Sequence, residues 1–229
     1  MTEMLLPGDP PVPLILRRSA RARRISLRVS QLDGRVTLTL PPRVPDREAL
    51  AFAHEKETWI RKHLAARTSD VDITAGALLP IGGQMHEVVP GQGRRVTIDA
   101  GLVWVPGAPD RMGRRLCGHL KQVARARLAA ASDHYAARLG RGYATLTLRD
   151  TRSRWGSCSS QGRLMYSWRL ILAPPEVLDY VAAHEVAHLA QMNHSPAFWA
   201  EVTRIHGSYE APRAWLRREG SGLHRYRFG

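Results

Sequence analysis

The chain has 229 residues, of which 44% are hydrophobic and 24% are charged, a composition typical of globular proteins and unlike that of fibrous or disordered ones. Two cysteines allow at most one disulfide, which excludes a disulfide-stapled secreted scaffold and favours a reducing compartment. Every apolar run is shorter than the roughly 20 residues that span a bilayer, and the first charges follow an apolar stretch instead of preceding it. We therefore expect no membrane span, no signal peptide and a cytoplasmic location.

Basic residues outnumber acidic ones by 34 to 20, which gives a formal net charge of +14. Such a charge attracts polyanions, although it says nothing about the fold. The arginines gather in two clusters, Arg17, Arg18, Arg21, Arg23, Arg24 and Arg28 near one end and Arg213, Arg217, Arg218, Arg225 and Arg227 near the other. We expect non-specific nucleic-acid association through this basic surface as an accessory property. The alternative is an arginine-rich surface that is merely solvated.

The first half of the chain is predicted to be rich in β-structure. Alternating apolar and polar residues predict strands over 23–29 and 36–40, joined in a hairpin by Leu32-Asp33-Gly34. A helix is predicted from Asp46, as its N-cap, to Arg67, since apolar residues recur at helical spacing and basic residues gather at its end. Glycine-rich turns then separate short strands predicted over 78–81, 85–89, 95–98 and 102–105.

A proline- and glycine-rich segment at residues 106–109 predicts a boundary between a β-rich N-terminal subdomain, 14–106, and a second domain, 109–229. A long helix is expected from Asp110 to Leu139, ended by Gly140. Further strands are expected over 144–149, 153–157 and 164–172, and further helices over 177–190 and from Pro196, with Ser195 as its N-cap. The expected fold class is α+β.

The predicted helix over 177–190 carries His184-Glu185-Val186-Ala187-His188. Histidines four residues apart are separated by about 40° around a helix and by one turn in height, so both rings can bind one metal ion. The glutamate between them is then placed to act as a general base. His194 can supply a third ligand, and three imidazoles leave the fourth tetrahedral position open, as catalytic zinc requires.

Three alternatives to this metal site stay open. Glu201 could replace His194 as the third ligand, although we favour His194 and expect Glu201 to accept a hydrogen bond from an imidazole N–H. A closed structural zinc site would need a fourth ligand, for which Cys158 is the plausible sulfur. Finally, the histidines could lie on a helix surface and bind no metal.

Several segments share their residues with one known family: Arg154-Trp155-Gly156-Ser157-Cys158-Ser159, the stretch from Trp168 to Pro174, the His-Glu-Val-Ala-His segment, Met192-Asn193-His194-Ser195 and Phe198-Trp199. Over about residues 17–218 the chain resembles the YgjP-like branch of the SprT-like zinc metallopeptidases. The resemblance implies a bacterial, cytosolic, minimal zincin-like catalytic domain in which a short sheet lies above the metal-bearing helix. It also implies that His184, His188 and His194 bind Zn²⁺ and that Glu185 is the catalytic base.

The predicted function is zinc-dependent peptide hydrolysis through a metal-activated water, with Glu185 as general base. An extended polypeptide substrate is expected to pair with the strand over 152–157, and the predicted substrate-binding residues are Trp155, Gly156 and Ser157. Candidates for stabilising the oxyanion are Arg154, His206 and Tyr209. The alternative function is that of a DNA-associated or scaffold protein with a structural or vestigial zinc site.

Overall fold

The computed structural model describes residues 2–30, 33–65 and 69–229, and the chain divides into two compact units, Met1–Ser69 and Asp70–Gly229. This division lies earlier in the chain than the boundary expected at 106–109. The strands that follow residue 70 share one hydrophobic core with the long helix, since Val88 and Val103 are fully buried in the same cluster as Leu116 and Leu120. The segment 106–109 therefore links two elements of one unit.

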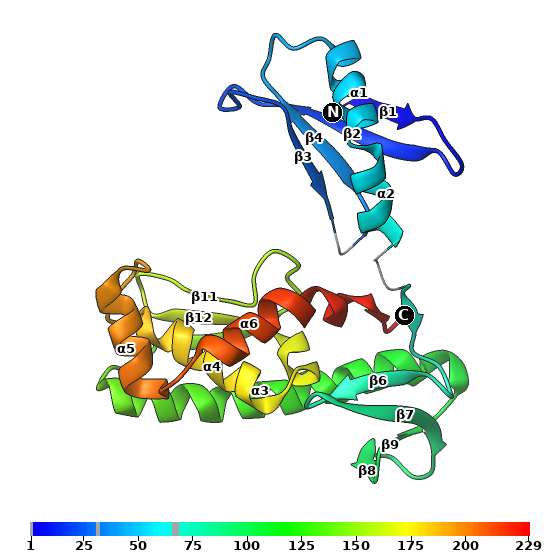
Figure 1. Ribbon diagram of the computed structural model, residues 1–229. Coiled ribbons are helices and arrows are strands. Elements are labelled where there is room, and N and C mark those ends of the chain that lie inside the picture. Colours follow the sequence, from blue (N-terminus) through cyan, green and yellow to red (C-terminus); the bar gives the residue numbers. More distant parts are fainter. Residues whose placement is uncertain (1, 31–32, 66–68) are drawn as a thin grey trace. The chain divides into compact units, whose positions relative to one another are not determined.

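Unit 1 (Met1–Ser69) is a four-stranded sheet with two helices on one face (Figure 1). Its strands are β1 (Thr2–Leu6), β2 (Val12–Arg18), β3 (Ser26–Val29) and β4 (Val36–Leu40). They lie in the order β1-β2-β4-β3, with β2 and β4 parallel and the other pairs antiparallel. The helices α1 (Asp46–Glu55) and α2 (Glu57–Ala65) bury Ala49, Ala53 and Ile60 against the sheet.

The predicted hairpin of β3 and β4 is confirmed, although Leu32 of its expected turn lies outside the described residues. The single helix expected from Asp46 is instead two helices that part at Lys56, and Arg67 also lies outside the described residues. Asp46 is not the N-cap. Its carboxylate accepts a hydrogen bond from the Arg18 guanidinium at 2.5 Å, so it joins the end of β2 to the start of α1.

Unit 2 (Asp70–Gly229) begins with a sheet at one end of the long helix. The strands β6 (Leu78–Ile81), β7 (Gln84–Gly91), β8 (Thr97–Asp99) and β9 (Leu102–Pro106) lie in the order β6-β7-β9-β8. All four strands were expected from the sequence, and each observed strand end lies within two residues of the expected one. A short strand, β5 (Val71–Asp72), pairs with β13 (Tyr226–Arg227) near the C-terminus.

The long helix α3 (Met112–Leu139) follows a short 3₁₀ turn, η1 (Pro109–Arg111), and is the longest element of unit 2 (Figure 1). It ends as expected at Gly140, whose φ of 74° is the left-handed conformation that glycine adopts without strain. Its buried stripe includes Leu116, Leu120 and Leu128, which pack under the remaining elements of the unit. The helix therefore joins the first sheet to the part of unit 2 that carries the histidines.

The second sheet of unit 2 has three strands, β10 (Thr145–Arg149), β11 (Gly156–Cys158) and β12 (Arg163–Ser167), in the order β10-β12-β11. The strand expected over 164–172 ends at Ser167, and the chain continues as the 3₁₀ helix η2 (Trp168–Leu172). All five residues of η2 are buried, so its sequence lacks the alternation of apolar and polar residues that distinguishes a strand. Among the described residues β11 pairs with β12 alone, so one of its edges is free there.

Four helical elements complete the unit: α4 (Pro175–Ala187), α5 (Pro196–His206), α6 (Glu210–Glu219) and η3 (Gly220–Arg225). The α+β fold class is confirmed, with β11 of the short sheet packed against α4. Across the described residues, we find no helix with the length and apolar character needed to cross a membrane.

Candidate metal centre

The helix α4 is the central buried helix of unit 2 and carries the first two histidines. Nine of its 13 residues are buried, so this helix is held on nearly every side. His188 is its C-cap residue, and the chain turns directly after it. Ser195 then caps α5, its Oγ accepting a hydrogen bond from the Phe198 N–H at 3.4 Å, with Pro196 in the first turn. His194 is thus fixed between two capped helices.

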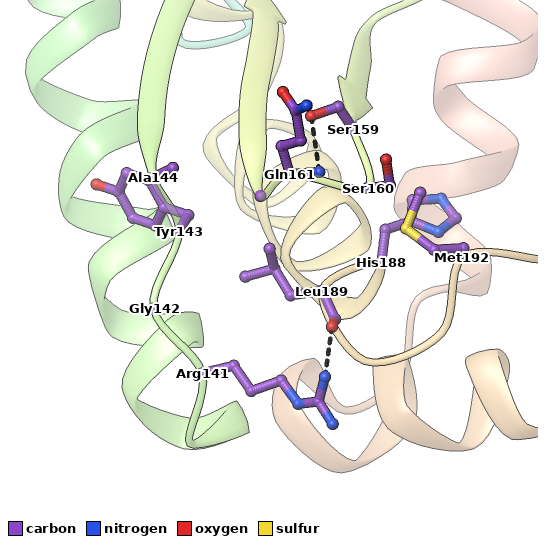
Figure 2. A pocket seen from close by; sticks show the side chains of 11 residues that line it. Arg141, Gly142, Tyr143, Ala144, Ser159, Ser160, Gln161, His188, Leu189 and Met192 are labelled. Carbon is purple, nitrogen blue, oxygen red and sulfur yellow. Dashed lines mark hydrogen bonds between the residues drawn. The ribbon is translucent and has the colours of Figure 1, made fainter.

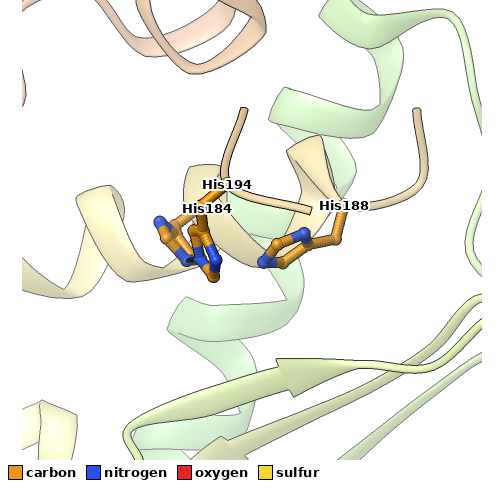
Figure 3. Close-up of side chains that lie close together, drawn as sticks. All are labelled: His184, His188 and His194. Atoms are coloured by element: carbon orange, nitrogen blue, oxygen red, sulfur yellow. Dashed lines mark hydrogen bonds between the residues drawn. The ribbon is translucent and has the colours of Figure 1, made fainter. Parts of the chain in front are cut away.

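His184, His188 and His194 lie close together (Figure 3), and their ring centroids form a nearly equilateral triangle. The ring centroids are 5.1 Å apart for His184 and His188, 5.0 Å for His184 and His194, and 4.9 Å for His188 and His194. One nitrogen from each ring lies within 4.8 Å of the others. Among the residues that the structure describes, this is the one group of three or more metal-ligating side chains close enough to share an ion.

Hydrogen bonds orient two of the rings. His188 Nδ1 lies 2.9 Å from the backbone oxygen of Gln191, which assigns the proton to Nδ1 and leaves the Nε2 lone pair free. His184 Nδ1 lies 3.5 Å from the Tyr180 hydroxyl. Glu201, considered from the sequence as a ligand or as an imidazole acceptor, instead accepts hydrogen bonds from Arg204 at 2.7 and 2.9 Å. The backbone oxygen of Gln191 therefore accepts the imidazole hydrogen bond that we expected the Glu201 carboxylate to accept.

Phe198 packs against all three histidines. Its ring centroid is 4.9 Å from His184, 4.4 Å from His188 and 4.9 Å from His194, and its side chain is fully buried. The sequence pointed to this residue only as part of a shared motif, without a role. Phe198 lies in the first turn of α5, which begins soon after His194 in the sequence. This closeness in sequence is the signal that could have identified Phe198 as a neighbour of the histidines.

The local environment disfavours charge on the buried groups of the site. Burial, with the neighbouring histidines as a second cause, lowers the pKa of His184 to about 3, and burial also lowers the pKa of His188. Burial raises the pKa of Glu185 to about 8, against the opposing charge of Arg154. Two of the rings are therefore neutral near pH 7, which is the form that binds metal ions.

A cavity of about 430 Å³ opens onto the three histidines. Its lining residues come from the loop before β11, from β11, from α4 and from the turn after it: Ser153, Arg154, Gly156, Ser157, Cys158, His184, Glu185, His188, Met192 and His194. A second cavity, of about 780 Å³, shares His188 and Met192 with the first (Figure 2). In its wall, Arg141 donates a hydrogen bond to the Leu189 oxygen at 2.8 Å, which holds the turn after α4.

The structure brings most of the predicted site residues together. Gly156 and Ser157 line the cavity with the histidines and Glu185. Trp155 does not line it, because its ring lies against His224, with centroids 5.1 Å apart, on the side of η3. Of the three oxyanion candidates Arg154 lines the cavity, whereas His206 and Tyr209 pack around Tyr180, with centroids 6.1 and 6.2 Å from its ring.

A family model described as YgjP-like, metallopeptidase domain, matches residues 23–219 of the chain. Among solved structures, the chain is similar to the crystal structure of the metallopeptidase zymogen of Pyrococcus abyssi abylysin, with 22% identity, a TM-score of 0.37, and coverage of 43% of this chain and 97% of that chain. No curated protein sequence matches the chain. Because the family match spans most of the sequence, the protein belongs to the YgjP-like family of metallopeptidases.

Proposed function

We propose that His184, His188 and His194 hold one zinc ion and that the protein hydrolyses peptide bonds with Glu185 as general base. The grouping of the three rings carries this proposal. Two nitrogens that each lie about 2.0 to 2.1 Å from one tetrahedral zinc ion are about 3.3 Å apart. The Nε2 atoms of His184 and His194 are 3.1 Å apart, which is compatible with that arrangement.

The donor set also fits zinc, because three imidazoles with no fourth protein ligand are typical of catalytic zinc sites. When bound, the ion supplies Lewis-acid polarisation and a lowered pKa for water at its open position. Glu185 follows the ligand His184 in sequence and faces the same cavity. Glu185 would be ionised when a cation occupies the site beside it, since an opposite charge lowers the raised pKa of its carboxyl group. Its carboxylate then takes the proton from the attacking water and passes it to the leaving amine nitrogen. Arg154 contributes the positive charge that stabilises the developing oxyanion.

The substrate is a polypeptide, and the free edge of β11 offers a way to hold one extended. Gly156 and Ser157 lie on this strand and line the cavity, so a peptide paired with the strand edge would pass the histidines. The second cavity would take a side chain of the substrate, with Leu189 and Met192 as its apolar contacts. Trp155 acts indirectly in this proposal, because its ring lies against His224 and anchors the residue that precedes β11.

Substitution of the base and of one ligand tests the proposal. Glu185→Gln should retain stoichiometric zinc, measured by elemental analysis, and lose hydrolysis of an unstructured substrate such as casein. His184→Ala should lose both metal and activity. Chelation should stop the reaction, and readdition of zinc should restore it. Full activity in Glu185→Gln would refute the general base and would favour a different chemistry at the histidines.

The same experiment decides between hydrolysis and a scaffold role with a vestigial zinc site, since a scaffold would bind zinc without any casein cleavage by the wild-type protein. A cytoplasmic location stays a prediction of the sequence. Nucleic-acid association also stays a prediction, and its strongest structural support lies in unit 1.

A further inference from the structure

The face of the unit 1 sheet opposite α1 and α2 carries arginine and hydroxyl side chains. Strand register defines this face, because residues paired across strands point to the same side. Arg17 on β2 pairs with Thr39 on β4, which pairs with Ser26 on β3. In the next row, Thr37 on β4 pairs with Arg28 on β3. We call the surface formed by Arg17, Ser26, Arg28, Thr37 and Thr39, with Arg21, Arg23 and Arg24 in the loop after β2, the basic sheet face.

The opposite face of the sheet forms the core of unit 1. Leu14, Leu16, Val36 and Leu38 alternate with the residues of the basic sheet face and are between 0 and 3% exposed. They share a cluster with the buried residues of α1 and α2. The five arginines of the basic sheet face are all exposed, so both helices lie on the other side and leave this face open within unit 1.

Within the part of the chain that the structure describes, these arginines have no carboxylate partner. Among the described residues, none of the five lies within 4.0 Å of an acidic group, whereas Arg18, next to Arg17, is paired with Asp46. The register puts one acidic residue on the face, Glu3 on β1, opposite Ile15. The positive charge of the face is therefore available to an external anion.

The arginine cluster near the C-terminus differs in this respect. The guanidinium of Arg213 lies over the Trp199 ring at 4.4 Å from its centroid, and Arg227 donates hydrogen bonds to Asp70 at 2.8 and 3.1 Å. Arg218 is paired with Glu219 at 2.8 Å. Two of the five arginines of this cluster thus pair with a carboxylate, against one of six in the N-terminal cluster, so among the described residues the N-terminal cluster keeps more unpaired charge.

The chemistry of the basic sheet face selects phosphate groups over bases. Its residues include no aromatic side chain on which an unpaired base could stack, and base stacking is the main contact of proteins that bind single strands. Arg17 and Arg28 lie on strands separated by β4 and pair with residues two apart along it, so their backbones are about 12 Å apart and their side chains can reach different phosphates. We propose that the basic sheet face binds the phosphate backbone of double-stranded nucleic acid without sequence preference.

Salt dependence of binding tests this proposal on the full-length protein. A labelled duplex of about 20 base pairs is titrated and followed by fluorescence anisotropy between about 50 and 200 mM salt. If all five arginines contact phosphates, the slope of log K against log salt should be about −4 to −5. The double variant Arg17→Gln/Arg28→Gln should have a slope shallower by about 2 and an affinity about 100-fold lower at the low end of this range.

The matched control is Arg43→Gln/Arg47→Gln, which removes the same charge from exposed positions before and on α1. This variant should bind the duplex as the wild-type protein does. The proposal would be overturned if both double variants weakened binding equally or if the wild-type protein did not bind the duplex at low salt. It would also be overturned if a single strand of equal length bound more tightly than the duplex, or if polyglutamate bound as well as the duplex. Casein hydrolysis should be unchanged in both variants, so its outcome stands apart from that of the proposed peptidase activity.

Discussion

Gly156 lies directly against the carboxylate side chain of Glu185. A Cβ atom added to Gly156 would be 2.6 Å from both Cγ and Oε1 of Glu185, a separation that real Cβ atoms do not adopt. The edge strand β11 therefore approaches α4 at a point where only a hydrogen atom fits. This contact places the backbone that would hold a substrate beside the group that would activate water.

Gly156→Ala should displace the Glu185 carboxylate without touching the histidines, because the three nearest atoms to the added methyl all belong to Glu185. Misplacing a catalytic group by about 1 Å can lower the rate about 100-fold, and we expect a loss of that order in kcat/KM for casein peptides. Overpacking should also lower the free energy of unfolding by about 1 to 3 kcal/mol. Zinc content should stay at the wild-type value.

Gly118→Ala is the matched control for this substitution. Gly118 lies on α3, and an added Cβ would meet nothing within 4 Å. This variant should keep wild-type activity and gain about 0.5 to 1 kcal/mol in stability, because alanine favours a helix over glycine. Wild-type kinetics in Gly156→Ala would show that the carboxylate has room to move and is not held by β11.

Phe198→Leu should weaken metal binding, because the Phe198 ring is the common surface against which the three histidines pack. Loss of the groups that hold ligands in place typically lowers metal affinity about 10-fold or more. Competition with a chromophoric chelator measures this affinity. Phe228→Leu is the control, since Phe228 is buried against Trp168, with centroids 5.3 Å apart, and should lose stability with unchanged zinc affinity. Equal zinc affinity in the two variants would contradict the supporting role of Phe198.

Local signals in the sequence were sufficient for the elements that carry the candidate metal site. The spacing of His184 and His188 predicted the shared face of α4, and the Ser195-Pro196 pair predicted the start of α5. Both depend on interactions within a few residues, for which capping and helical period are direct guides. The glycine after α3 and the strands of the first sheet of unit 2 were predictable for the same reason.

These local signals do not predict the contacts between segments that are distant in the sequence. Nothing local indicates that Gly156 meets Glu185, that Phe198 lies under three histidines, or that Trp155 turns toward His224. The strands β1 and β2 were also missed. Prolines lie between them and within β2, and β2 pairs with β4, which lies further along the chain. The change from β12 to η2 has the same origin, since burial on every side removes the alternating pattern.

Arg169 clamps the C-terminal segment of unit 2. Its side chain is 9% exposed, donates to both oxygens of Asp150 at 2.6 and 3.1 Å, and donates to the backbone oxygens of Leu223 and Tyr226 at 3.0 and 3.1 Å. Arg169→Met should lower the free energy of unfolding in urea by about 1 to 3 kcal/mol for each of the two backbone oxygens that it leaves unpaired, those of the buried residues Leu223 and Tyr226, whereas the half-exposed Asp150 carboxylate regains water. Arg227→Gln removes a more exposed pair and should cost about 1 kcal/mol or less. Similar losses of unfolding free energy in both variants would contradict the proposed role of Arg169 in holding the C-terminal segment.

His224 makes the stability of unit 2 sensitive to acid. Burial lowers the pKa of His224 to about 4, with the Arg169 charge as a second cause, although Asp150 opposes the shift. The unfolded chain has a histidine pKa near 6.5 and therefore binds the proton first as the pH falls. This contribution to stability is fully present above about pH 6.5 and is lost progressively toward pH 4. Urea unfolding at several pH values in this window should show a steeper decline for the wild-type protein than for His224→Gln. Parallel declines in the two proteins would mean that His224 does not carry the effect.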